Sequence, residues 1–217
     1  MKNIKLLSLL AMMLFAFVSC EETEETPEFG NWKKRNEQYL DSIATVARAN
    51  ADGAWNVFLA TGLDESKEWS NEYYVYCNVL QAGDGTVSPA YTDTVLVNYS
   101  GRLIPSKSYS KGFEFDASYS GELDPAFDVP VKFSLAGTVR GFSTAIQHMV
   151  AGTTNTTGDI WSVYVPSELG YGSTEYSGIP ASSTLVFDIN LVSFTPAGVP
   201  LNKDYGNEQR QSIADRT

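Results

Sequence analysis

Two hydrophobic periods divide the chain. Residues 31–50 carry apolar side chains at helical spacing, among them Trp32 and Leu40, with charged residues between them. This spacing predicts an amphipathic helix with one apolar face, and Asn31 is its expected cap and Gly53 its expected stop. Because its polar face mixes both signs of charge, we expect the helix to pack on the rest of the protein or on a partner rather than on a membrane surface.

From residue 72 onward the hydrophobic period changes to two. Strand-like runs separated by turn residues lie at 73–80, 94–100, 113–116, 129–135, 160–165 and 184–194. One helical pattern interrupts them at 141–149, whereas residues 54–71 suggest a polar loop to which we assign no element. Many strands around one short helix predict an α+β fold in which a curved antiparallel sheet wraps on that helix.

The start of the chain has the layout of a secretory signal peptide. Lys2 and Lys5 precede an uncharged, mostly apolar run that ends at Cys20 and is too short to span a bilayer comfortably. Residues 17–20 resemble a bacterial lipobox, in which the cysteine is lipidated, although Phe17 stands where leucine is usual. We therefore expect an exported protein anchored through lipidated Cys20, with a plain signal peptide and an incidental cysteine as the alternative.

These patterns predict five segments: a signal peptide (1–19), an acidic tether (20–30), a helical extension (31–71), a folded domain (72–195) and a polar tail (196–217). The expected location is the bacterial cell envelope, with the outer membrane favoured and the side of the membrane left open. The acidic tether is expected to be a solvated linker.

Composition narrows the range of functions. The net charge is −11, and an acidic chain is a poor candidate for nucleic acid because it would have to neutralise phosphates with scarce Lys and Arg. With two Cys and one His, a zinc site made of these residues is excluded on count. Cys77 is expected to be a small buried hydrophobe, and His148 an exposed or half-exposed residue near a helix end.

Several short motifs follow one another along the predicted domain. They are Val97-Asn98-Tyr99-Ser100-Gly101, Phe115-Asp116-Ala117-Ser118, Lys132-Phe133-Ser134-Leu135 with Val139-Arg140-Gly141-Phe142, Pro166-Ser167-Glu168-Leu169-Gly170-Tyr171-Gly172, and Gly178-Ile179-Pro180 with Ser183-Thr184-Leu185-Val186-Phe187-Asp188. In order and spacing these motifs resemble the FKBP family of peptidyl-prolyl cis-trans isomerases. Each motif is weak evidence alone, and their shared order carries the resemblance.

The resemblance implies an FKBP-like fold that isomerises X–Pro peptide bonds. Isomerisation twists an amide against a barrier of roughly 18–20 kcal/mol without making or breaking a bond to carbon, so no nucleophile, metal or cofactor is expected. A dry aromatic cup helps because water stabilises the planar, charge-separated amide, and fixed donors can hold the twisted form more tightly than the planar one.

The resemblance also implies which residues form that cup. The expected catalytic residues are Tyr99, Phe115, Asp116 and Tyr171, with the Tyr171 hydroxyl donating to a substrate carbonyl and Asp116 bonded to Tyr99 or a neighbour. The expected substrate-binding residues are Val131, Val139, Phe142, Tyr176, Ile179 and Phe187. For Phe133, Leu135, Leu185 and Ile189 we expect ordinary core packing, because they alternate along strands.

The chain departs from the family pattern at several positions. Phe142 stands where tryptophan is usual, Val131 where an aromatic residue is common, and Thr138 where the family is usually apolar. These departures leave the fold expectation unchanged and put the turnover rate in question.

Three functions stay open. The first is an isomerase that assists the folding of exported, proline-containing polypeptides. The second is a module that binds or chaperones proline segments with weak or absent catalysis. The third is an adaptor in which the helix at 31–50 docks a partner or forms a homodimer.

Overall fold

The computed structural model describes residues 27–152 and 157–200. The predicted signal peptide, the lipidation site at Cys20 and nearly all of the predicted tail lie outside the described residues. The chain divides into two compact units, 1–30 and 31–217, and the second contains every helix and strand of the described residues. In the first unit the described residues form a turn, closed by a 2.7 Å hydrogen bond from the Gly30 N–H to the carbonyl of Pro27.

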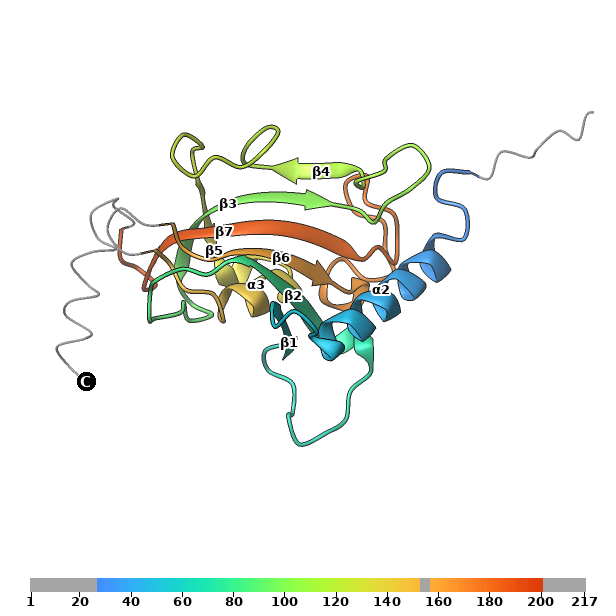
Figure 1. Ribbon diagram of the computed structural model, residues 1–217, viewed down its shortest axis with the longest axis horizontal. Helices are drawn as coiled ribbons and strands as arrows, with labels where there is room; N and C mark the ends of the chain where they lie inside the picture. The colour runs from blue at the N-terminus through green and yellow to red at the C-terminus, as the bar shows by residue number, and fades with distance from the viewer. Residues whose placement is uncertain (1–26, 153–156, 201–217) are drawn as a thin grey trace, which may run out of the picture. The chain divides into compact units, whose positions relative to one another are not determined.

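Seven strands form one antiparallel sheet (Figure 1). The strands are β1 (Trp55–Leu59), β2 (Tyr74–Gln81), β3 (Thr94–Arg102), β4 (Glu114–Ala117), β5 (Val131–Ser134), β6 (Ile160–Val165) and β7 (Leu185–Thr195). Their order is β1-β2-β6-β7-β3-β4, and β5 also pairs with β3. The first part of β3 pairs with β5 and its last part with β4, so two separate segments meet along one edge of β3.

Two α-helices cover opposite faces of this sheet. They are α2 (Trp32–Ala49) and α3 (Arg140–Ile146), and three short 3₁₀ helices, η1 (Asn71–Tyr73), η2 (Leu135–Gly137) and η3 (Ser167–Leu169), lie in the connections. Successive side chains of a strand point to opposite faces. In β2, Cys77 packs with Ile146 of α3, whereas its neighbour Tyr76 packs with Leu40 and Ala44 of α2. We call these sides the α3 face and the α2 face.

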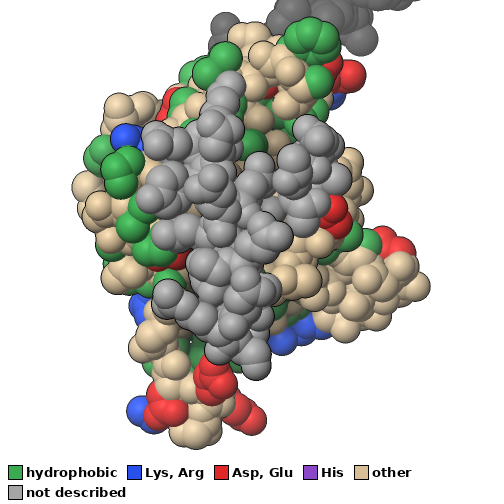
Figure 2. Space-filling model, turned by 90° about the vertical axis from the view of Figure 1, so that its left-hand side faces the viewer, with side chains coloured by type: hydrophobic (Ala, Val, Ile, Leu, Met, Phe, Trp, Pro, Cys, Tyr) green, Lys and Arg blue, Asp and Glu red, His purple; other side chains and the backbone are tan. Residues whose placement is uncertain are grey.

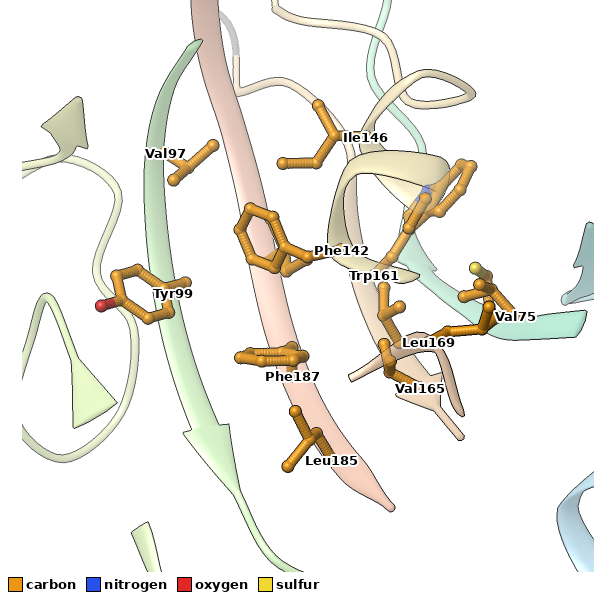
Figure 3. Close-up of a cluster of buried hydrophobic side chains, with 14 of the residues drawn as sticks. Val75, Val97, Tyr99, Phe142, Ile146, Trp161, Val165, Leu169, Leu185 and Phe187 are labelled. Carbon is orange, nitrogen blue, oxygen red and sulfur yellow. The ribbon is translucent and has the colours of Figure 1, made fainter. Parts of the chain in front are cut away.

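The main core lies on the α3 face. Figure 3 shows part of this cluster, in which aliphatic residues such as Val97 and Leu185 surround the aromatic rings of Phe142 and Phe187. Close packing of α3 depends on Gly141, because a Cβ there would lie 2.3 Å from Cγ1 of Val165 on β6. The predicted α+β fold, a curved antiparallel sheet on one short helix with an amphipathic helix before it, is confirmed.

The ends of α2 differ from the prediction. Asn31 occupies the N-cap position with left-handed backbone and without a side-chain capping bond, and the helix stops at Asn50 rather than Gly53. Asn50 adopts a left-handed conformation and its N–H bonds to the carbonyl of Val46, which is how asparagine can end a helix. The buried face also includes the polar residue Asn36.

The region 54–71 holds a strand that the pattern did not predict. β1 pairs with β2 along its whole length, and the rest of the region is the polar loop that was expected. That loop protrudes at the bottom of Figure 1, and charged side chains gather at the same lower tip in Figure 2. The other strands lie where they were predicted, within a few residues. In the described part of the chain, we find no helix with the length and apolar character needed to cross a membrane.

Candidate functional site

A cavity of about 220 Å³ opens on the α3 face where β3, β4, β5, β7 and α3 converge. Most of its lining residues are aromatic. The full lining is Tyr99, Phe115, Asp116, Phe133, Gly137, Thr138, Val139, Phe142, Tyr171, Tyr176 and Phe187.

The Phe142 ring stands at the centre of an aromatic cluster that forms the floor. Its centroid lies 5.3 Å from that of Phe187, 6.0 Å from Phe133 and 6.2 Å from Tyr99, each pair being edge to face. Figure 3 shows Phe142 reaching from α3 toward Tyr99 on β3 and Phe187 on β7. Edge-to-face contacts at these separations are the arrangement that aromatic quadrupoles favour, so the floor is apolar and held from several sides.

Gly101 on β3 makes room for two rings of the wall. A Cβ at this position would lie 2.7 Å from ring carbons of Phe115 and 2.8 Å from a ring carbon of Phe187. These rings pack edge to face with centroids 5.8 Å apart. A side chain at this position would force one of these two rings to shift.

Tyr99 and Asp116 form the polar edge of the cavity. The Tyr99 hydroxyl donates to Oδ2 of Asp116 over 2.5 Å. Asp116 was expected to bond either to Tyr99 or to a neighbour, and the structure shows the first. Tyr99 is 7% exposed, and burial, reinforced by the bond to Asp116 and its charge, raises the pKa of Tyr99. Two bonds with Ser118 fix this turn on β3: its Oγ accepts the Tyr99 N–H at 2.9 Å, and its own N–H donates to the Tyr99 carbonyl at 2.8 Å.

The opposite wall comes from the loop after η3. Tyr171 stacks on Tyr176 with ring centroids 4.2 Å apart and an interplanar angle of 10°. Burial, with smaller contributions from Tyr176 and Asp116, raises the pKa of Tyr171, so its hydroxyl stays a hydrogen-bond donor at neutral pH. Ser177 and Gly178 both have positive φ, as a two-residue hairpin turn requires.

The structure brings most of the predicted site residues together. The cavity is lined by Tyr99, Phe115, Asp116, Tyr171, Val139, Phe142, Tyr176 and Phe187. Two predicted residues do not line it: Val131 lies half-buried on β5, and Ile179 is 3% exposed within the core. Their assigned roles, like the catalytic roles of the others, stay predictions.

Three lining residues were not predicted as site residues. Phe133 was assigned to ordinary core packing, yet it lies on the cavity wall, and Gly137 and Thr138 line the cavity between η2 and α3. The alternation along β5 shows which face Phe133 occupies but not whether the space opposite is filled. Thr138 had one signal, a polar residue at a usually apolar position of the family pattern.

The chemically reactive residues lie elsewhere. Cys77 is fully buried and burial raises its pKa, as fits a small buried hydrophobe. His148 is exposed to solvent overall, but one side of its ring stacks on Phe58 with centroids 3.8 Å apart. This partial desolvation lowers its pKa. Among residues 27–152 and 157–200, no group of three His, Cys, Asp or Glu is placed to hold a metal ion.

A cavity with these walls in a sheet wrapped on a short helix defines an FKBP-like domain, and comparisons with known proteins agree. The family described as FKBP-type peptidyl-prolyl cis-trans isomerase matches residues 85–192. The domain at residues 85–192 therefore belongs to that family, as its motifs predicted.

Two curated relatives illustrate the similarity. The FKBP-type peptidyl-prolyl cis-trans isomerase FkpA of Escherichia coli (strain K12) is 39% identical over 120 residues, covering 55% of this chain and 37% of the relative. Outer membrane protein MIP of Legionella longbeachae is 33% identical over 120 residues, covering 55% and 43%. The chain thus spans about two-fifths of the length of these relatives.

A solved structure supports the fold. The peptidyl-prolyl cis-trans isomerase from Pseudomonas syringae pv. tomato superposes with a TM-score of 0.50 at 21% identity, covering 75% of this chain and 96% of that chain. At this identity the likeness is one of fold.

Proposed function

We propose that this protein is a peptidyl-prolyl cis-trans isomerase that assists the folding of exported polypeptides. The observation that carries the proposal is the aromatic cavity floored by Phe142 and edged by the Tyr99–Asp116 pair, in a domain of an isomerase family. The cavity is apolar where a proline ring would sit and polar where an amide carbonyl would emerge.

The floor would act by taking the X–Pro amide out of water. A planar amide owes part of its stability to charge separation, which water solvates. With the proline ring against Phe142, Phe187 and Phe133, the amide lies in an apolar environment where that charge separation is less favourable. Desolvation therefore destabilises the planar ground state more than the twisted transition state, in which the carbonyl and the nitrogen are no longer conjugated.

The polar residues would act on the twisted amide. The Tyr171 hydroxyl remains protonated at neutral pH and can donate to a substrate carbonyl, and a bond that strengthens in the twisted geometry lowers the barrier. The Tyr99 hydroxyl is committed to Asp116, so we assign this pair to holding the wall between β3 and β4 and placing a carboxylate beside the site. No step needs a nucleophile or a metal.

A short X–Pro peptide tests the proposal. Cis-to-trans exchange is measured by NMR or a coupled assay for wild type and for Phe115→Ala, Asp116→Ala and Tyr171→Phe. We expect Phe115→Ala to lower kcat/KM at least about tenfold, a loss of about 1.4 kcal/mol, and Tyr171→Phe to lower it several-fold. Phe127→Ala is the matched control, because Phe127 is 84% exposed and outside the cavity lining.

A second function is favoured by one observation. The floor carries phenylalanine where the family usually has tryptophan, so it lacks an indole N–H and is smaller. A folded wild type that binds the peptide without accelerating exchange would contradict the isomerase and leave a proline-segment binding module.

We also infer that the protein is exported and anchored in the cell envelope through lipid on Cys20. The support is the lipobox-like run before Cys20 and the name of a relative, Outer membrane protein MIP. Mass spectrometry of the membrane-extracted protein should find an acylated N-terminal Cys20. A Cys20→Ser variant should lose the modification and leave the membrane fraction, and an unmodified, membrane-free wild type would contradict the anchor.

A homodimer through α2 stays a prediction. The apolar face of α2 packs on its own sheet, so a dimer would have to form through the outer face, where Val46 is 52% exposed. Sedimentation of wild type and Val46→Glu tests this contact: a monomeric wild type excludes it, and a dimer that Val46→Glu dissociates supports it.

A further inference from the structure

The segment at residues 170–184, here called the pocket loop, carries two tyrosines of the cavity wall. Its outer part is exposed, with Tyr176 at 55%, whereas its last residues are buried, Ser183 at 3% and Thr184 at 2%. The hairpin at 176–179 closes the tip, and a 2.8 Å bond from the Ser182 N–H to the carbonyl of Gly172 closes the base. The buried end therefore fixes where the loop leaves the sheet.

Two residues in the first turns of α2 hold that buried end. Trp32 Nε1–H donates to Oγ of Ser183 at 2.8 Å, and the Thr184 N–H donates to Oδ1 of Asn36 at 2.7 Å. The Asn36 amide is itself fixed, since its Nδ2 donates to the Trp32 carbonyl at 2.8 Å. Trp32 is 6% exposed and Asn36 2%, so water cannot readily replace either partner.

The connection continues into the loop. Ser183 Oγ, which accepts from Trp32, donates in turn to the carbonyl of Pro180 at 2.6 Å. Pro180 directly follows the hairpin at 176–179 that carries Tyr176. The chain of bonds thus runs from α2 to the segment that stacks against Tyr171.

Apolar packing does not fully seal this junction. A second cavity, of about 100 Å³, lies between α2 and the loop base and is lined by polar residues of both, including Asn36, Ser182 and Thr184. Where surfaces do not interlock, directional hydrogen bonds decide orientation, and a buried donor that loses its acceptor is costly. The Trp32 and Asn36 bonds are therefore what sets the angle of the loop base.

We propose that Trp32 and Asn36 are positioning residues for the active site, acting through the pocket loop on Tyr171 and Tyr176. This inference rests on the proposed isomerase function. It makes α2 a working part of the catalytic domain in addition to a cover for the sheet.

Asn36→Leu and Trp32→Phe test the inference, because each removes the hydrogen-bonding group and leaves an apolar side chain of similar or smaller size at the position. Ala47→Gly is the matched control: it weakens the same helix at a buried position away from the loop. Amide hydrogen exchange is measured by NMR at Ile179 and Ser182 in the loop and at Val163 in the sheet, with kcat and KM on an X–Pro peptide.

We expect Asn36→Leu to speed exchange at Ile179 and Ser182 about tenfold relative to Val163, and to lower kcat/KM about three- to tenfold, mainly through KM. Trp32→Phe should act in the same direction with a smaller change. Ala47→Gly should leave the loop-to-sheet exchange ratio and kcat/KM unchanged.

Unchanged loop exchange in both Asn36→Leu and Trp32→Phe would overturn the inference, as would a loosened loop with unchanged kcat/KM. If wild type proves inactive, the isomerase proposal fails separately. Amide exchange and X–Pro peptide affinity then decide whether Trp32 and Asn36 position a binding site. An affinity that both variants leave unchanged overturns the inference.

Discussion

The two faces of the sheet are held by different kinds of contact. On the α3 face most neighbours of the cavity are aromatic rings, and rings such as Phe142 and Phe187 meet edge to face around it. On the α2 face polar bonds are part of the packing: Arg102 pairs with Asp188 at 2.8 Å, and Ser162 Oγ donates to Asp188 over 2.5 Å.

The two faces of the sheet therefore respond differently to substitution. Apart from the Tyr99–Asp116 bond at one edge, the shape of the cavity depends on the volumes of the side chains around it. A polar junction tolerates small voids because its bonds have direction. Substitutions on the α3 face should therefore change stability and catalysis together. Those on the α2 face should change stability alone, except at Trp32 and Asn36, which hold the pocket loop.

The largest effect is expected from Phe142→Ala on the α3 face. Removing this buried ring should lower the free energy of unfolding by about 3–5 kcal/mol and abolish most of the isomerase activity, because the cavity loses its floor. Urea unfolding and the peptide assay measure the two effects. Ala47→Gly on the α2 face is the comparison, with an expected cost of about 1 kcal/mol and unchanged kcat/KM. An active Phe142→Ala protein would mean that proline sits elsewhere.

Gly101→Ala should have the next largest effect. The new methyl must displace the Phe115 or Phe187 ring, and overpacking of this kind costs about 1–3 kcal/mol. We expect kcat/KM to fall more than stability alone would suggest, since both rings line the cavity. Ser100→Ala changes the neighbouring residue, which points to the α2 face, and should leave kcat/KM as in wild type. Equal activity of the two variants would contradict this account of the wall.

The same contrast explains what could be predicted from the sequence. Strand β6 alternates clearly, with every second side chain buried, and its position was predicted well. β1 was missed because its side chains, except that of Asn56, are at least partly buried, so the period of two disappears. A short strand covered on both faces does not show the alternation on which the prediction depends.

The site was predictable to the extent that it lies in family motifs. Tyr99, Asp116 and Tyr171, which the motifs named, line one cavity. Phe133, expected in the core, packs against it and also lines the cavity, whereas Ile179, expected at the cavity, is buried outside the lining. Local spacing cannot distinguish these because the difference lies in what a distant segment places opposite each residue.

Asn36 was beyond any local pattern for the same reason. Its partner Thr184 lies 148 residues away in sequence. A single asparagine among charged residues of a helix looks like a solvated position, and only the fold reveals that it binds a buried backbone N–H.

Ser162→Ala should give a smaller change, confined to stability. It removes one hydrogen bond to Asp188, a loss of about 1 kcal/mol, while Arg102 still pairs with the carboxylate. Thermal or urea unfolding measures the change, and kcat/KM should match wild type. A clear loss of activity would mean that residues of the α2 face other than Trp32 and Asn36 also affect the cavity.

The smallest effect at ordinary pH is expected from the tyrosines, which lie on both faces. Burial, with Tyr164 adding to it, raises the pKa of Tyr39 on the α2 side from its ordinary value near 10 to about 12, and burial raises that of Tyr99 on the α3 side. The folded protein therefore holds these protons more tightly than the unfolded chain. Their contribution to stability is complete below pH 10, and that of Tyr39 is lost as the pH rises toward 12.

Two measurements separate the faces in this alkaline range. Unfolding free energy should be independent of tyrosine ionisation up to about pH 10 and then fall, and Tyr39→Phe should make that fall shallower without changing kcat/KM. Catalysis should show no alkaline inflection below that pH, because the Tyr171 donor stays protonated. An inflection near pH 8 that Tyr171→Phe removes would show that this hydroxyl ionises far more readily than its half-buried position allows. In that case water would reach the Tyr171 side of the cavity. Only Phe142 and Phe187 would then exclude water from the substrate amide.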